Sequence, residues 1–338
     1  MAGKTRRAKN GSQHGWMRAF LLFILSVIIV AGVIYFTGVT PEQIDSAISS
    51  VFGEGLFEAS GSGEQEHAGA DGSPDDYSGL LPEKGKLTVT VLDVGQADCI
   101  VIVSPSGKTM LIDCGLSSTE DRVNAYLEAA QIDSFDVVVA THPHSDHIGG
   151  MAEILRSREF RAIYMPRVTH DSKTYDELIS VIEDHGLKAK AAEYGVTIPF
   201  DDALTVQILA PVADDYDSLN DYSAVVRIDY NNSSFLFTGD AEMISEMDMV
   251  STCKDLLNAD VLKVGHHGSA TSSTEDFLNA VSPQYAVISV GEGNSYGHPN
   301  SAVIDALEQQ NCRVYRTDQD GTVSFVTDGK NYVVKTQR

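Results

Sequence analysis

The chain has 338 residues, of which 43% are hydrophobic and 21% are charged, so it can bury the core of one large domain or of two ordinary ones. Its formal net charge of −24 argues against a dedicated nucleic-acid-binding module, because phosphate binding depends mainly on lysine and arginine. Its four cysteines show no CxxC spacing, which argues against a cysteine-based metal site.

A basic tail and an uncharged apolar run open the chain. Residues 1–18 contain the basic cluster, and residues 19–38, AFLLFILSVIIVAGVIYFTG, can cross a hydrocarbon core of about 30 Å as one helix. The next lysine or arginine is Lys84, so the positive-inside rule predicts a cytoplasmic tail, a single-pass anchor in the cell membrane and an extracellular remainder. A cleaved signal peptide is the alternative, but its apolar core would be shorter and would end in small residues.

Residues 39–85 are predicted to link this anchor to a folded domain. Residues 39–53 have the pattern of a short helix, with Thr40 as its cap and Pro41 at its first position. Residues 54–85 are rich in Gly, Ser, Glu and Asp, and they bury too little apolar surface to offset the entropy of ordering. We therefore expect a flexible stalk, followed by one domain over residues 86–338 that no second linker interrupts.

Strands open this domain, and alternating strands and helices follow. LTVTVLDV, DCIVIVS and TMLIDCG read as strands, the last two joined by a tight turn at residues 106–107, before a helix over residues 120–131 and a strand over residues 136–140. This order predicts an α/β sandwich in which helices cover two packed sheets. Further strands are predicted at residues 161–165, 205–210, 223–230, 234–239, 260–265, 285–291, 313–317 and 322–327, and helices near residues 175–185, 241–251, 273–281 and 301–310.

The hairpin has a consequence for two cysteines. If it turns at residues 106–107, the numbers of facing residues sum to 213, which places Cys99 opposite Cys114. Cross-strand Cβ atoms are about 4.5–5.5 Å apart, slightly wide of the roughly 3.5–4.5 Å of a disulfide. A disulfide and a pair of small buried thiols therefore both stay open.

The strongest chemical signal is THPHSDHIGG, residues 141–150, which follows an apolar strand and precedes a helix. His142, His144, Asp146 and His147 are a dense set of ligands for zinc, or for another divalent ion such as manganese. The spacing lets the first two side chains bind one ion while the last two face a second. A polar surface loop without a metal is the alternative, but it rarely combines so many ligands after a buried strand.

This HxHxDH motif resembles the metallo-β-lactamase superfamily. LDVGQADCI, KVGHHGSATSS and SYGHP resemble segments of the extracellular hydrolase domain of ComEC competence proteins. The resemblance implies a four-layer αββα sandwich over residues 86–338 with two divalent ions, zinc or manganese, bridged by Asp240. It also implies that Asp113 braces the HxHxDH loop from behind.

The later histidines receive their expected roles from the same resemblance. It implies that His298 binds the second ion, whereas His267 or His266 donates a proton or contacts a phosphate, beside Asp146. Tyr296, next to this histidine in SYGHP, is a further candidate for substrate contact. The alternative is that these histidines are ordinary loop residues without a functional role.

One feature departs from the superfamily pattern, which usually supplies a third histidine to the first ion. Only His170 and His185 lie in the corresponding stretch, the first soon after the loop and the second at the end of a predicted helix. A ComEC-like pattern has Asn and Ser here, matched by Asn220 and Ser223. The first ion is therefore expected to be weakly held, or to have its coordination completed by water.

The site predicts hydrolysis. Two ions and nearby imidazoles suit a phosphoryl centre, so a phosphodiesterase or nuclease is expected, with single-stranded DNA as a possible substrate and no protein partner inferred. Two alternatives remain. One is a hydrolase of another ester or lactam (a phosphorylcholine esterase, lactonase or β-lactamase), and the other is a catalytically idle, anchored binding module. Asp93, Gln96 and Asp98 either shape the floor of the cleft or cap a strand bend.

Overall fold

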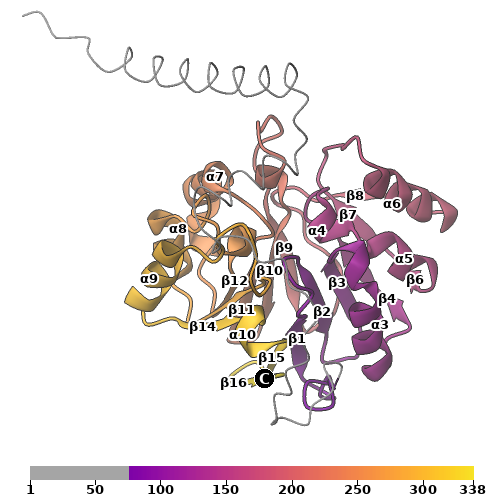
Figure 1. Cartoon of the computed structure of the whole chain (residues 1–338), viewed down its shortest axis with the longest axis horizontal. Helices are drawn as coiled ribbons and strands as arrows, with labels where there is room; N and C mark the ends of the chain where they lie inside the picture. Colours follow the sequence, from indigo (N-terminus) through magenta and orange to yellow (C-terminus); the bar gives the residue numbers. More distant parts are fainter. Residues whose placement is uncertain (1–75) are drawn as a thin grey trace, which may run out of the picture. The chain divides into compact units, whose positions relative to one another are not determined.

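The computed structural model describes residues 76–338 (Figure 1). The predicted cytoplasmic tail, transmembrane anchor and most of the predicted linker lie outside the described residues. Within residues 76–338, no helix is both long enough and apolar enough to span a membrane.

The first sheet has eight strands in the order β16-β15-β1-β2-β3-β5-β7-β8. Its first half is an antiparallel meander, whereas β3, β5, β7 and β8 run parallel. The strands are β1 (Leu87–Val91), β2 (Cys99–Val103), β3 (Thr109–Cys114), β5 (Val137–Val139), β7 (Ile163–Met165), β8 (Lys190–Ala191), β15 (Val323–Thr327) and β16 (Tyr332–Thr336).

The second sheet has six strands in the order β14-β13-β12-β11-β10-β9. Here β9, β10 and β11 are antiparallel, and β11 to β14 are parallel. The strands are β9 (Thr205–Ala210), β10 (Val225–Tyr230), β11 (Ser233–Phe237), β12 (Val261–Lys263), β13 (Tyr285–Ile288) and β14 (Arg313–Arg316). A separate pair, β4 (Ser134–Phe135) and β6 (Glu159–Phe160), forms a two-stranded sheet.

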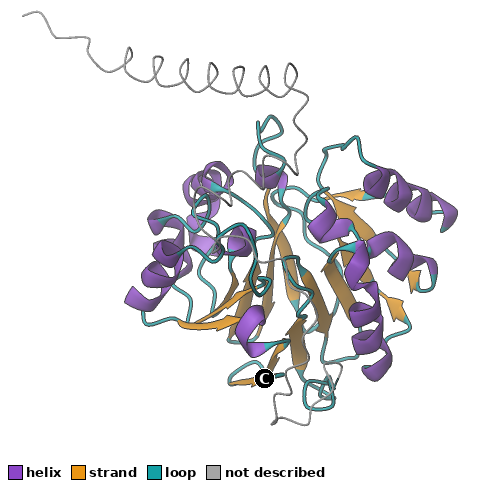
Figure 2. Ribbon diagram, viewed as in Figure 1, coloured by secondary structure: helices purple, strands orange, loops and turns teal. Residues whose placement is uncertain are grey.

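Helices cover the outer faces of both sheets, which gives four layers (Figure 2). On the first sheet lie α3 (Glu120–Ala129), α4 (Ser145–Ile148), α5 (Met151–Arg156) and α6 (Lys173–Asp184), and on the second lie α7 (Met243–Cys253), α8 (Glu275–Val281) and α9 (Ser301–Gln309) (Figure 1). Shorter pieces are α10 (Thr317–Asp320) and the 3₁₀ turns η1 (Ser117–Thr119), η2 (Asn220–Tyr222), η3 (Lys254–Leu256) and η4 (Gly265–Gly268).

Side-chain alternation along the strands explains the layering. In β2, Ile100 and Ile102 enter the core between the sheets, while Cys99 and Val101 enter the core beneath the helices of the first sheet. This two-residue period is what an extended strand with both faces covered requires. The predicted four-layer αββα sandwich is therefore confirmed.

The β2–β3 hairpin differs from its predicted register. Cys99 does pair with Cys114, but Ile100 pairs with Ile112, because an irregularity after Cys99 shifts the rest of the ladder by one residue. Both thiols of the pair are buried and free. Contact with Cys114 and burial raise the pKa of the Cys99 thiol, which keeps it protonated and inert at neutral pH.

The last residues of the predicted linker pack onto the domain. Tyr77 and Leu80 are 3% and 2% exposed, and both belong to the core beneath α3 and α5. The Tyr77 ring lies edge-on to Tyr126, with centroids 5.3 Å apart. Residues 77–80 of the predicted linker are therefore packed as part of the domain.

The parallel strands determine where the site forms. Strands that run parallel end at the same edge of a sheet, and ligands of α/β proteins gather beyond these carboxyl ends. The loops after β5, β11, β12 and β13 carry the HxHxDH motif, Asp240, the two adjacent histidines and His298, respectively.

Candidate metal centre

The HxHxDH loop is held in place by Asp113 at the end of β3. Its carboxylate accepts hydrogen bonds from the backbone N–H of Thr141 (2.8 Å), from the Thr141 hydroxyl (2.6 Å) and from Nδ1 of His147 (2.7 Å). The loop also needs Gly149, since a Cβ there would clash with the carbonyl oxygen of Ser145. These contacts connect Asp113 to the loop backbone, to the Thr141 hydroxyl and to the His147 ring.

The second sheet supplies Asp240 and η4. The two adjacent histidines of η4, His266 and His267, both have positive φ angles (49° and 54°), a conformation that costs a non-glycine residue on the order of 1–3 kcal/mol. In this conformation Nδ1 of His267 donates to the carbonyl oxygen of Ser289 at 2.9 Å. Its Nε2 is thereby directed at Asp146, 3.3 Å away.

Four residues from the two sheets converge to form one cluster. Asp146, His147, Asp240 and His267 each place one ligand atom within 4.8 Å of the others. Nε2 of His147 lies 3.2 Å from Oδ1 of Asp240, yet neither atom makes a hydrogen bond, although both are fully buried. Buried polar atoms almost always make hydrogen bonds, so the lack of one at both atoms fits a cation bound between them.

A second pair of ligand atoms lies beside this cluster. Nε2 of His142 and Nδ1 of His144 are 3.0 Å apart, and Oδ2 of Asp240 is 3.8 Å from the former. Asp240 therefore lies between both sets of imidazoles. That position fits a carboxylate that bridges two ions.

Ser223, one of the two residues matched by the ComEC-like pattern near the missing third histidine, contacts two of the predicted ligands. Its hydroxyl is fully buried, lies 3.3 Å from Nδ1 of His142 and accepts the backbone N–H of Asp240 at 3.0 Å. The hydroxyl therefore fixes two ligands from behind. His170 lies farther out, with its ring centroid 6.1 Å from that of His144, and the His185 ring nitrogen bonds its own helix at Val181.

The charges in the cluster favour cations. Burial opposes ionisation of Asp240, but the neighbouring imidazoles of His147 and His267 hold the pKa of its carboxyl well below the usual range. Burial likewise opposes a charge on His147, but Asp240 and Asp113 hold the pKa of His147 well above its usual value. Burial and His147 keep the pKa of His142 low, so this imidazole is neutral and able to bind a metal.

The remaining predicted residues form a rim around the cluster. Nδ1 of His266 is 3.0 Å from the Thr271 hydroxyl and 3.2 Å from Glu242, which also accepts from Nδ2 of Asn220 at 3.3 Å. The His298 ring lies 5.7 Å from that of His266, and no ligand atom of His298 belongs to the four-residue cluster. Tyr296 is 71% exposed, and its ring stacks on His298 at 5.8 Å.

Several supporting residues carry no local sequence signal. Lys263 and Asp98 form a buried ion pair with 2.8 Å between Nζ and Oδ2, and Oδ1 of Asp98 is 3.6 Å from Nδ1 of His267. Lys263 reads simply as part of a strand, so only the fold reveals its role. Glu242 and Thr271 are likewise ordinary loop residues in the sequence.

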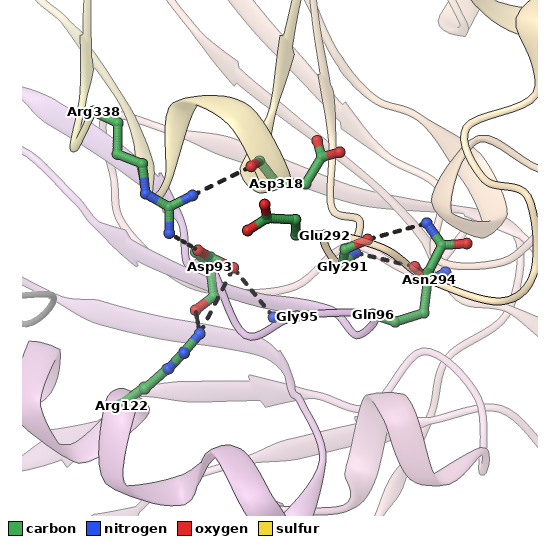
Figure 3. A pocket seen from close by; sticks show the side chains of 9 residues that line it. All are labelled: Asp93, Gly95, Gln96, Arg122, Gly291, Glu292, Asn294, Asp318 and Arg338. Atoms are coloured by element: carbon green, nitrogen blue, oxygen red, sulfur yellow. Dashed lines mark hydrogen bonds and ion pairs between the residues drawn. The ribbon is translucent and has the colours of Figure 1, made fainter. Parts of the chain in front are cut away.

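Two pockets open near this edge of the domain. One, of about 340 Å³, is lined by Asp93, Gln96, Arg122, Gly291 and neighbours (Figure 3). The other, of about 610 Å³, is strongly acidic. Its lining includes five carboxylates, those of Asp215, Asp217, Asp221, Glu242 and Asp248.

Comparisons with known proteins agree with this geometry. A family model described as the metallo-beta-lactamase superfamily matches residues 92–292. The chain is 30% identical over 254 residues to "ComE operon protein 3" of Bacillus subtilis, which covers 70% of this chain and 32% of that protein. It is 30% identical over 253 residues to "Competence protein ComA" of Neisseria gonorrhoeae (72% and 33% covered), and 31% identical over 240 residues to "Recombination protein 2" of Haemophilus influenzae (70% and 28%). The chain thus spans about a third of the length of these relatives, and the expected likeness to competence proteins of the ComEC type is confirmed.

Proposed function

Because the chain belongs to the metallo-β-lactamase superfamily, we propose that it is a hydrolase that binds two divalent ions and cleaves phosphodiesters. The observation that carries this proposal is the position of Asp240, which lies between the His142–His144 pair and the Asp146–His147–His267 group. Ions held in both places would supply a water of lowered pKa as the nucleophile and positive charge at the reacting centre.

The residues around the cluster have separate tasks in this proposal. Asp113, Ser223 and Asp98 orient the ligating imidazoles from behind. His266 and His298 present partly exposed rings at the rim, where N–H groups can bind phosphoryl oxygens as negative charge develops.

Exposed rim residues favour a nucleotide substrate. Tyr296 offers a largely exposed ring beside His298, and stacking on such a ring is worth about 1–3 kcal/mol for a nucleobase. The acidic charge of the chain disfavours a long duplex, which requires many basic contacts. A short or single-stranded phosphodiester is therefore the preferred substrate, in keeping with the competence proteins among the relatives.

The acidic pocket supports a second candidate, a phosphodiester with a cationic alcohol such as choline. Tyr216 lines this pocket together with the five carboxylates, and aromatic rings with carboxylates bind quaternary ammonium groups.

Placement of the enzyme is part of the proposal. Residues 19–38 would anchor it in the cell membrane with the hydrolase domain outside.

The test is turnover of bis-p-nitrophenyl phosphate by metal-free protein, with and without added zinc or manganese. Linear single-stranded DNA, a phosphocholine ester and nitrocefin, assayed side by side, separate the two candidates from lactam hydrolysis. We expect metal-dependent turnover of the diester and of the DNA. Cleavage of nitrocefin alone would indicate a lactam hydrolase, and no cleavage of any of these compounds would indicate a binding module; either result would make the proposal wrong.

The His144→Ala and Asp146→Ala variants test the site itself. His144 is the N-cap of α4 and Asp146 lies in its first turn, and both residues are only partly buried, so the variants should stay folded while metal content and turnover fall together. His185→Ala is a matched control, because within residues 76–338 this imidazole hydrogen-bonds its own helix and packs on Phe160, away from the cluster. Full activity in either site variant would contradict the assignment.

A further inference from the structure

Gln96 joins two loops that border the metal cluster. It lies between β1 and β2, and it reaches Gly291 and His298 in the loop that follows β13. The two backbones approach so closely that a Cβ at Gly291 would lie 2.8 Å from the backbone nitrogen of Gln96. Figure 3 shows Gln96 directed at this loop, at the edge of the pocket that Arg122 lines from the other side.

The contacts determine the orientation of the Gln96 amide. The backbone N–H of Gly291 can only donate, and it lies 3.0 Å from Oε1 of Gln96. The oxygen must therefore face Gly291, which leaves the NH₂ group facing Nδ1 of His298 at 3.3 Å.

The amide in turn determines the tautomer of the imidazole. An NH₂ group has only donors, so Nδ1 of His298 must accept and carry no proton. The proton of the neutral ring is then on Nε2. Within residues 76–338 no hydrogen bond uses this Nε2, and the ring is only partly buried beside His266.

A protonated Nε2 is incompatible with metal ligation through that atom. The Nε2–H group can instead donate a hydrogen bond, and a neutral imidazole can offer this donor to an oxygen on which negative charge develops. Burial and the adjacent His266 and His267 also lower the pKa of His298, so the ring is neutral at physiological pH.

We infer that Gln96 is a positioning residue that holds His298 as its Nε2–H tautomer, so that His298 donates a hydrogen bond to a phosphoryl oxygen of the substrate. No proton is transferred in this contact, and no ion is held by His298. The inference rests on the proposed phosphodiesterase function for its kinetic consequence, but not for the tautomer.

Two measurements on Gln96→Met test it. This change keeps the length of the side chain and removes both amide groups. In the zinc-loaded protein, ¹⁵N NMR should show a protonated Nε2 and an unprotonated Nδ1 at His298, and the variant should lose this preference. The variant should keep its metal content while kcat for bis-p-nitrophenyl phosphate falls about 10- to 100-fold, the usual cost of removing such a supporting contact.

Arg122→Met is the matched control, because Arg122 lines the same pocket and pairs with Asp93 but does not contact His298. It should leave the tautomer and kcat unchanged. A protonated Nδ1 at His298 in the unaltered protein, or loss of metal in Gln96→Met, would overturn the inference. If no diester is cleaved at all, it is the proposed function that has failed, and the NMR measurement still decides the tautomer.

Discussion

His267 and His298 differ in the partner of Nδ1, and this separates what their Nε2 atoms can do. His267 donates from Nδ1 to a carbonyl oxygen, so in the neutral ring Nε2 carries no proton and, facing Asp146, is available to a metal ion. His298 accepts at Nδ1 from an amide, so its Nε2 carries the proton. The geometry thus favours the reverse of the roles that resemblance alone implies.

This difference gives a prediction for two alanine variants. His267→Ala should lose about one ion per chain, because its imidazole belongs to the four-residue cluster. His298→Ala should keep both ions but lose about 10²- to 10³-fold in kcat, the usual cost of removing one donor to a developing charge. Elemental analysis and turnover of the same samples check this. Metal loss only in His298→Ala would restore the roles implied by the resemblance.

The sequence predicts ligands that lie close together along the chain, but it does not predict contacts between residues that are far apart along the chain. HxHxDH is one local motif, so its four ligands could be named directly. The tautomers of the late histidines depend on Ser289 and Gln96, which no local pattern connects to them. The buried partner of Asp98, Lys263, could not be predicted for the same reason.

Helices α7 and α8 are joined by one carboxylate. Glu246 of α7 is 1% exposed and accepts the backbone N–H groups of Ser273 (2.6 Å) and Thr274 (2.8 Å), just before α8 begins. Ser273 has a positive φ of 62°, a conformation that these contacts help to hold. Burial nonetheless raises the pKa of Glu246 to about 7.

A pH dependence of stability follows from this carboxyl. Its pKa is higher in the folded chain than in the unfolded one, where it is about 4.3, so between these values the folded state binds more protons. The free energy of unfolding should therefore fall as pH rises from about 4.5 to 7, by up to about 1.4 kcal/mol for each step of one in pH. Glu246→Gln cannot titrate at this position. In urea unfolding, the free energy of unfolding of the unaltered protein minus that of Glu246→Gln should therefore be smaller at pH 8 than at pH 5. A difference that does not change with pH would contradict this.

The elements themselves were largely predictable, because strands buried on both faces read as continuous apolar runs. The predicted strands over residues 205–210 and 322–327 correspond to β9 and β15. Four strands were not predicted. β4, β6 and β8 have two residues each, which is too short for a periodic pattern, and β16 is an edge strand that is only partly buried. The hairpin register was displaced by one residue because an irregularity next to Cys99 has no signature in composition.

At the scale of the whole domain, the cluster connects the two sheets. Asp146 and His147 follow β5 of the first sheet, whereas Asp240 and His267 follow β11 and β12 of the second. Ions bound here would hold together two layers whose other contacts are chiefly those of the apolar core between them. Metal binding should therefore increase the free energy of unfolding of the domain.

We expect zinc to raise the melting temperature of metal-free protein. Zinc at 100 times its dissociation constant contributes about 2.7 kcal/mol, which corresponds to roughly 5–10 °C for a domain of this size. Differential scanning fluorimetry with zinc, and again with a chelator, measures the shift. Asp146→Ala should respond less, since it lacks one ligand. Identical melting temperatures with and without zinc in the unaltered protein would contradict a cluster that binds ions across both sheets.

The distribution of ligands along the chain also has a consequence in time. A ribosome completes HxHxDH at residue 147, long before it reaches Asp240 and His267. Until those residues exist and the second sheet has docked, the early motif offers only part of the cluster. On the proposed function, the complete site therefore forms only late, after both sheets have been synthesised and have docked.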